Sequence, residues 1–124
     1  MKDIAKKKKV PLETVVMNDE ARSINLHDNV GVIINLQNSD KSGSHWVLCV
    51  RVDGVNYYFD SYACIPSDDV VKMLKRDKDD CIQYNDTQIQ GFDESFCGIA
   101  CLYVLHELVN KKRSFEDVIF SFSQ

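Results

Sequence analysis

Residues 46–59 read WVLCVRVDGVNYYF, two runs of apolar, β-branched and aromatic residues separated by Asp53-Gly54. Asp-Gly readily adopts the positive φ angles of a two-residue turn, so this stretch predicts a β-hairpin. With the turn at positions 53 and 54, residues should pair across the hairpin where their numbers sum to about 107. His45 would then lie opposite position 62, near Asp60 at the end of the second strand. A hydrogen bond between that carboxylate and the imidazole would fix the tautomer of a general base.

A cysteine stands at the head of the apolar stretch FCGIACL, residues 96–102. Residues 97–110 predict a long helix, and a helix N-terminus beside an imidazolium favours the thiolate form of a cysteine. Gly98 leaves room for a substrate backbone next to the sulfur, which makes it a substrate-binding candidate. Taken alone, Cys97 would more often be a buried core cysteine, which is the role we expect for Cys49 and Cys101.

Two glutamines precede this cysteine on a strand expected over residues 87–90. Gln90 lies seven positions before Cys97 (97 − 90 = 7) and shares a strand face with Gln88, so either amide could donate a hydrogen bond to an oxyanion. A pair of solvent-facing glutamines would give the same pattern. The order His45, Asp60, Gln90, Cys97 nevertheless contains a base, an orienting carboxylate, an oxyanion donor and a nucleophile. These four residues are the candidate catalytic set of a thiol hydrolase.

The other segments favour an α+β domain with a central mixed or antiparallel sheet. The run VGVIINL, residues 30–36, predicts a strand buried on both faces. Ser67 can cap a helix over residues 66–76. We also expect a strand or packed loop over residues 12–17, a polar connection over 18–29, a turn over 39–44, a strand over 81–84 and a short helix from Ser114.

Length and composition predict one domain, residues 1–124, in a soluble and unsecreted protein. The chain is 44% hydrophobic and 27% charged with a net charge of −4, so no whole-chain basic field indicates nucleic acid. No apolar run approaches the roughly 18 residues of a membrane span, and the Lys-rich start lacks the apolar region of a secretory signal. The five cysteines form an odd set without CxxC pairs, which fits a reducing compartment. We expect no metal, no cofactor and a monomer.

The segments around the four candidate residues resemble a known protease family. GSHW at residues 43–46, YFDSY at 58–62, Gln90, and FCG at 96–98 before an apolar helix are similar to the adenain family of viral cysteine proteases. They resemble more distantly the SUMO-deconjugating ubiquitin-like proteases. The similarity spans roughly residues 28–108. The Gln-to-Cys spacing resembles adenain, whereas an aspartate at position 60 resembles the smaller members found in virophages, large DNA viruses and transposons.

This resemblance implies a papain-related fold in circularly permuted order, with Trp46 beside the catalytic histidine as a wall of the substrate groove. It implies a cysteine endopeptidase that processes viral or mobile-element precursor proteins, most plausibly capsid proteins, after small residues such as Gly-Gly. The expected location is a virion or the nucleus or cytoplasm of an infected host cell. Two alternatives remain open: a deubiquitinase or SUMO isopeptidase with the same chemistry, and a catalytically silent binding module with the same fold.

The basic block Lys6, Lys7, Lys8 and Lys9 allows three interpretations. Followed by Val10-Pro11, it resembles a nuclear import signal, and it could also contact DNA, which assists adenain. Four charges would give only a weak, salt-sensitive contact with phosphates. We favour the simplest interpretation, a flexible basic tail over residues 1–10.

Overall fold

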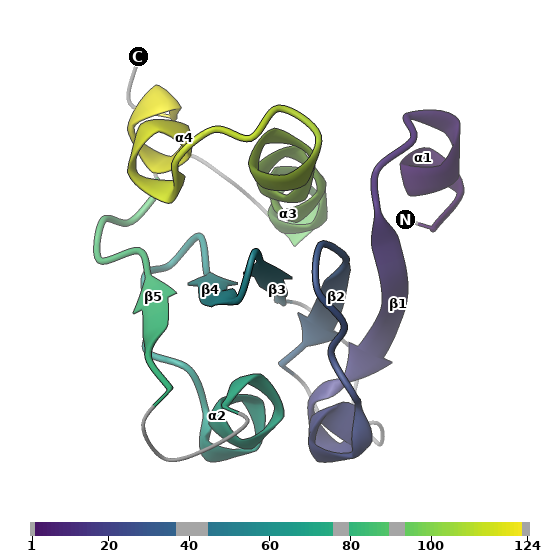
Figure 1. Ribbon diagram of the computed structural model, residues 1–124, viewed down its shortest axis with the longest axis vertical. Coiled ribbons are helices and arrows are strands. Elements are labelled where there is room, and N and C mark those ends of the chain that lie inside the picture. Colours follow the sequence, from purple (N-terminus) through teal and green to yellow (C-terminus); the bar gives the residue numbers. More distant parts are fainter. Residues whose placement is uncertain (1, 37–44, 76–79, 90–93, 123–124) are drawn as a thin grey trace.

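The computed structural model describes residues 2–36, 45–75, 80–89 and 94–122 and has an α+β architecture (Figure 1). Its five-stranded sheet has the order β1-β2-β3-β4-β5. The strands are β1 (Leu12–Met17), β2 (Gly31–Asn35), β3 (Trp46–Val52), β4 (Val55–Phe59) and β5 (Ile82–Tyr84). The two outer pairs are parallel and the two inner pairs antiparallel, so the sheet is mixed. The predicted α+β class with a central mixed sheet is confirmed.

The hairpin of β3 and β4 has the register that its turn predicted. Leu48 pairs with Phe59 and Val52 with Val55, so the partner numbers sum to 107 (48 + 59, 52 + 55). The turn residues Asp53 and Gly54 have φ angles of 50° and 83°. These positive angles let a two-residue turn match the twist of the strands.

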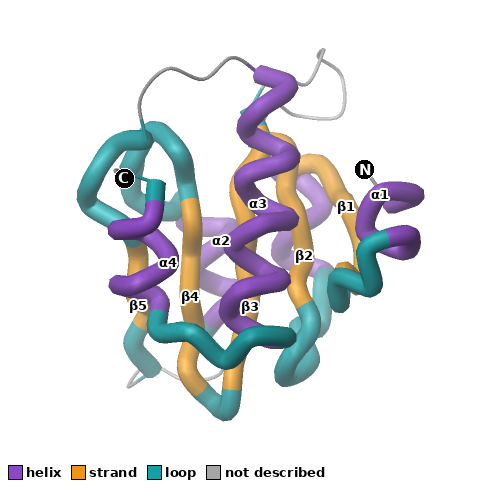
Figure 2. The backbone as a smooth tube through the Cα atoms, turned by 90° about the horizontal axis from the view of Figure 1, so that it is seen from above, coloured by secondary structure: helices purple, strands orange, loops and turns teal. Residues whose placement is uncertain are grey.

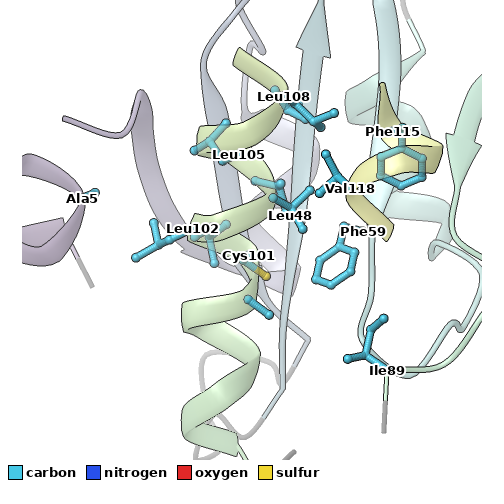
Figure 3. Packing of buried hydrophobic residues seen from close by; sticks show 14 residues of the cluster. Ala5, Leu48, Phe59, Ile89, Cys101, Leu102, Leu105, Leu108, Phe115 and Val118 are labelled. Carbon is cyan, nitrogen blue, oxygen red and sulfur yellow. The ribbon is translucent and has the colours of Figure 1, made fainter. Parts of the chain in front are cut away.

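Helices cover both faces of the sheet (Figure 1). One face carries α3 (Glu94–Val109) and α4 (Phe115–Ser121), and the other carries α2 (Asp68–Leu74) and the 3₁₀ helix η1 (Asn18–Ser23). Because side chains alternate along a strand, β2, β3 and β4 each supply both cores. Ile33, Leu48 and Phe59 belong to the cluster with α3 (Figure 3), whereas Val32, Val47 and Tyr58 belong to the cluster with α2. Every residue of β2 is buried, as predicted for a strand covered on both faces.

Helix α3 lies close against the central strands, and it carries Cys97 (Figure 2). A Cβ atom added to Gly31 of β2 would lie 2.6 Å from one methyl carbon of Leu105 and 2.8 Å from the other. Glycine at this position therefore permits the close approach of strand and helix. This packing fixes the position of α3 along the sheet, relative to the end at which the chain enters β3.

The helix starts agree with the sequence where a side chain caps them. Ser67 accepts a hydrogen bond from the Val70 N–H at 3.4 Å, and Ser114 accepts one from the Asp117 N–H at 3.1 Å. Helix α2 ends at Leu74, earlier than expected, and Arg76 lies outside the described residues. Helix α3 begins at Glu94, three residues before its predicted start (97 − 94 = 3). Cys97 is therefore the fourth residue of the helix rather than the first.

The N-terminal segment differs from the expected tail over residues 1–10. Residues Lys2–Lys7 form a helix, α1, which ends in two lysines and packs near β1. Its Ala5 is only 3% exposed, and the carbonyl of Ala5 accepts a hydrogen bond from the N–H of Val10. An apolar contact on one face thus orders a segment whose charge pattern suggested a solvated tail.

Two further expectations are corrected. The connection over residues 18–29 contains η1, whose Ala21 is fully buried. The strand expected over residues 87–90 is absent from its described part, because the sheet pairing of β5 stops at Tyr84. Within the described residues, no helix has the length and apolar character needed to cross a membrane.

Candidate active site

His45 and Asp60 meet at the end of the hairpin. His45 directly precedes β3 and Asp60 directly follows β4, so the register brings both to the same edge. The Nε2 atom of His45 lies 2.6 Å from Oδ1 of Asp60. The Asp60 side chain is 1% exposed and that of His45 is 13% exposed. A short hydrogen bond in this buried environment fixes the orientation of the imidazole ring, and Nδ1 remains available as a hydrogen-bond acceptor.

Cys97 approaches the other nitrogen of the same ring. Its Sγ atom lies 3.4 Å from Nδ1 of His45, although the two residues are 52 positions apart in the chain. Cys97 is in the first turn of α3, where unpaired backbone N–H groups give a positive partial charge. The sulfur of Cys97 therefore lies near both the start of α3 and the imidazole of His45. The structure brings together three of the four predicted catalytic residues.

The two oxygen atoms of the Asp60 carboxylate have different hydrogen-bond environments. Its Oδ1 accepts hydrogen bonds from His45 and from the backbone N–H of Tyr62 at 2.8 Å. Its Oδ2 is buried and has no hydrogen-bond partner among the described residues. A buried carboxylate with an unpaired oxygen is stabilised by a positive charge beside it. A protonated ring at His45 would supply that charge.

Tyr62 covers the catalytic ring. Its ring is stacked on the imidazole of His45, with centroids 4.2 Å apart and planes 10° apart. The hairpin register extended by three pairs places position 62 opposite His45, so this neighbour follows from the turn itself. Stacking on an aromatic face restrains the orientation of the imidazole ring. We did not assign a role to Tyr62 from the sequence, although the pairing rule pointed to its position.

Asn85 holds the backbone of Asp60 through hydrogen bonds. No role was assigned to this residue from the sequence. Its Oδ1 accepts a hydrogen bond from the N–H of Asp60 at 3.0 Å, and its Nδ2 donates one to the Asp60 carbonyl at 2.7 Å. The same amide donates to the carbonyl of Thr87 at 3.3 Å. Asn85 directly follows β5 and is 4% exposed. Its side chain thus continues the pairing of β4 with β5 by one further residue.

Ser61 touches the sulfur from a third direction. Its Oγ lies 3.4 Å from Sγ of Cys97, and the residue is 1% exposed. The carbonyl of Ser61 accepts a hydrogen bond from the N–H of Ile89 at 2.8 Å. The segment after β5 therefore anchors two consecutive residues, Asp60 through Asn85 and Ser61 through Ile89.

The other buried thiols have a different environment. Burial raises the pKa of Cys49 and of Cys101, so both stay protonated at neutral pH. Cys101 lies one turn beyond Cys97 in α3, and its S–H donates to the carbonyl of Trp46 at 3.6 Å. These two cysteines match the structural role that the sequence suggested. Among these three buried cysteines, Cys97 is the one in contact with an imidazole.

The two expected substrate-binding residues have different positions. Gly98 is buried and is the fifth residue of α3, directly after the nucleophile candidate. Trp46 begins β3 and packs, partly buried, against the core cluster under α3. The aromatic ring found against His45 is that of Tyr62.

The remaining predicted residues lie apart from these contacts or outside the description. Gln90 lies outside the described residues, and Gln88 is exposed. Ile89, which precedes Gln90 in the chain, is fixed to Ser61 by its backbone. The side chains of Lys6, Lys7, Lys8 and Lys9 are all exposed, at and just after the end of α1.

No protein-family model and no curated protein sequence matches this chain. In the parts of the chain that the structure describes, no group of three or more His, Cys, Asp or Glu side chains is arranged to hold a metal ion.

Proposed function

We propose that this chain is a cysteine endopeptidase with Cys97 as nucleophile, built on the papain-related fold in circularly permuted, adenain-like order. One observation carries the proposal: a continuous line of contacts from Sγ of Cys97 to Nδ1 of His45 at 3.4 Å, and from Nε2 to Oδ1 of Asp60 at 2.6 Å. His45 and Asp60 flank the hairpin of β3 and β4, whereas Cys97 is in α3, and the histidine and aspartate precede the cysteine in the chain. This is the arrangement that nucleophilic catalysis by a thiol requires.

In the acylation step, Nδ1 of His45 takes the proton of Cys97, and the sulfur attacks the carbonyl carbon of the scissile bond. The imidazolium that forms is stabilised by Asp60 on one edge and by Tyr62 on one face. The imidazolium then gives its proton to the leaving amine as the C–N bond breaks. A thioester between Cys97 and the acyl half of the substrate remains.

In the deacylation step, His45 takes a proton from water, and the hydroxide attacks the thioester. The C–S bond breaks and the thiolate of Cys97 is restored. We assign the stabilisation of the oxyanion to the amide of Gln90 and to the backbone N–H groups at the start of α3, which have no partner within the helix.

We propose that the substrates are precursor proteins, including viral or mobile-element capsid precursors, cleaved after small residues. The site offers two restraints on side chains near the scissile bond. Tyr62 is 42% exposed and stands beside His45, and Cys97 itself is fully buried. A substrate that reaches the sulfur must therefore present a slim backbone, which Gly-rich sequences do best.

Digestion of a diverse peptide library, read by mass spectrometry, tests this proposal. The purified protein should cleave peptide bonds, with small residues enriched before the cleaved bond, and Cys97→Ala should abolish the cleavages. The matched control is Cys81→Ala, which removes an exposed cysteine remote from the site's contacts. Cleavage that persists in Cys97→Ala would contradict the assigned nucleophile.

The two alternative functions give different results in parallel assays. A ubiquitin or SUMO isopeptidase would cleave ubiquitin-like conjugates much faster than any library peptide. A silent binding module would cleave neither. Enrichment of bulky residues before the cleaved bond would overturn the proposed specificity but not the chemistry.

A further inference from the structure

We infer that Ser61 is a catalytic residue whose hydroxyl donates a hydrogen bond to the sulfur of Cys97 and stabilises its thiolate. This inference rests on the proposed function, in which Cys97 is the nucleophile. The Ser61 hydroxyl would be a third group that contacts the sulfur, in addition to the helix end and the imidazole. The observation behind it is the distance of 3.4 Å between Ser61 Oγ and Cys97 Sγ.

The position of Ser61 is well determined by its neighbours. The residue follows Asp60 directly, and the backbone N–H of Tyr62 bonds to the Asp60 carboxylate, which closes a tight turn around Ser61. The N–H of Ala63 bonds to the Asp60 carbonyl at 2.8 Å, and the N–H of Ile89 bonds to the Ser61 carbonyl at 2.8 Å. The hydroxyl is therefore held against the sulfur by backbone contacts on both sides.

The direction of the hydrogen bond follows from the partners available. Among the described residues, the sulfur of Cys97 is the one hydrogen-bond partner of the Ser61 hydroxyl, and the residue is 1% exposed. A buried O–H group keeps its hydrogen bonded wherever a partner exists, so the hydrogen points at Sγ. The sulfur can accept it as a thiol, and does so more strongly as a thiolate.

The two donors around the sulfur then act together. After proton transfer, Nδ1 of His45 carries a hydrogen that points at Sγ, and the Ser61 hydroxyl provides the second. Hydrogen bonds to the charged form of a group favour that form. No proton leaves Ser61 in this scheme, because its hydroxyl only orients toward the negative charge. Cys101, the nearest described thiol in α3, stays neutral because burial raises its pKa.

The ultraviolet absorbance of the thiolate, followed between pH 4 and 9, tests this inference without any substrate. The signal of Cys97 is the difference between the protein and its Cys97→Ala variant. Ser61→Ala should move the midpoint of thiolate formation up by about one pH unit, which reduces the thiolate about tenfold at a pH well below the midpoint. Ser61→Gly should produce the same upward shift, so that one variant supports the other if either folds poorly. Ser23→Ala removes an exposed hydroxyl elsewhere and should leave the midpoint unchanged.

The outcomes separate this inference from the proposed function. If His45→Ala raises the midpoint but Ser61→Ala does not, the role of Ser61 is refuted and the proposed nucleophile stands. If the midpoint falls in Ser61→Ala, the hydroxyl accepts from the thiol instead, which also refutes the inference. If neither variant changes the midpoint of Cys97, both proposals fail. A raised midpoint in Ser61→Ala, in a protein that cleaves no peptide, would support the hydrogen bond and count against the endopeptidase.

Discussion

Replacing Asn85 should lower both the stability of the fold and the activity that we propose for His45, although Asn85 and His45 share no hydrogen bond. In Asn85→Ala the buried N–H of Asp60 loses its acceptor, and the Asp60 carbonyl loses a donor at 2.7 Å. An unpaired buried N–H costs about 1–3 kcal/mol, and the lost second bond adds about 1 kcal/mol. The free energy of unfolding should therefore fall by roughly 2–4 kcal/mol.

The effect on activity follows from the position of Asp60. Its carboxylate orients His45 through a 2.6 Å hydrogen bond, so a displaced backbone misplaces the general base. We expect kcat/KM for peptide cleavage to fall about tenfold or more. Urea denaturation measures the loss of stability, and activity should be compared at a temperature where both proteins remain folded. Asp86→Ala, an exposed neighbour, is the control and should change neither quantity appreciably.

A second substitution separates the hydrogen bond that the Asn85 amide accepts from the two that it donates. Asn85→Asp keeps an acceptor for the Asp60 N–H but sets a carboxylate oxygen against the Asp60 carbonyl. Burial beside an acceptor raises the pKa of the new carboxyl in the folded state, so this variant should gain stability as the pH falls and lose it as the pH rises. If the free energy of unfolding of Asn85→Ala lies within 1 kcal/mol of the wild-type value and kcat/KM is unchanged, Asn85 does not hold Asp60 in place as we infer.

Two further predictions concern stability. Gly31→Ala should lower the free energy of unfolding by about 1–3 kcal/mol in a urea titration, because the added Cβ would lie 2.6 Å from a Leu105 methyl carbon. An unchanged free energy of unfolding would mean that α3 can move away at little cost. A hydrogen bond from Arg113 lowers the pKa of Glu107. The ionised carboxylate therefore stabilises the fold above the usual titration range of a carboxyl group. This stabilisation is lost as the pH falls through the lowered pKa. Glu107→Gln should accordingly lower the melting temperature at pH 7 but not at pH 3, and an equal effect at both values would contradict the ion pair.

The local part of this structure could be predicted from the sequence. Asp53-Gly54 determines the hairpin register, and the register alone brings His45 and Asp60 to one edge. Ser67 and Ser114 mark helix starts because a cap is a contact over three residues. In each case the relevant physics lies within a few residues of the chain.

The parts that were missed depend on contacts between distant segments. Asn85 reaches Asp60 across 25 positions, and this contact exists because β5 pairs in parallel with β4, which no local pattern specifies. The helix at residues 2–7 forms because Ala5 packs into the core. Ser61 could be recognised as a neighbour of the sulfur only after the position of α3 was known. Long-range packing overrides local propensity at each of these places.

Site-resolved alkylation at pH 6 measures whether contact with His45 favours the thiolate of Cys97. Cys49, Cys97 and Cys101 are all 0% exposed, so burial alone predicts equal and slow labelling of the three. Our account predicts that iodoacetamide labels Cys97 at least tenfold faster than either of the others, and that His45→Ala removes the difference. Equal rates for the three buried cysteines, or a fast Cys97 that is indifferent to His45→Ala, would contradict it.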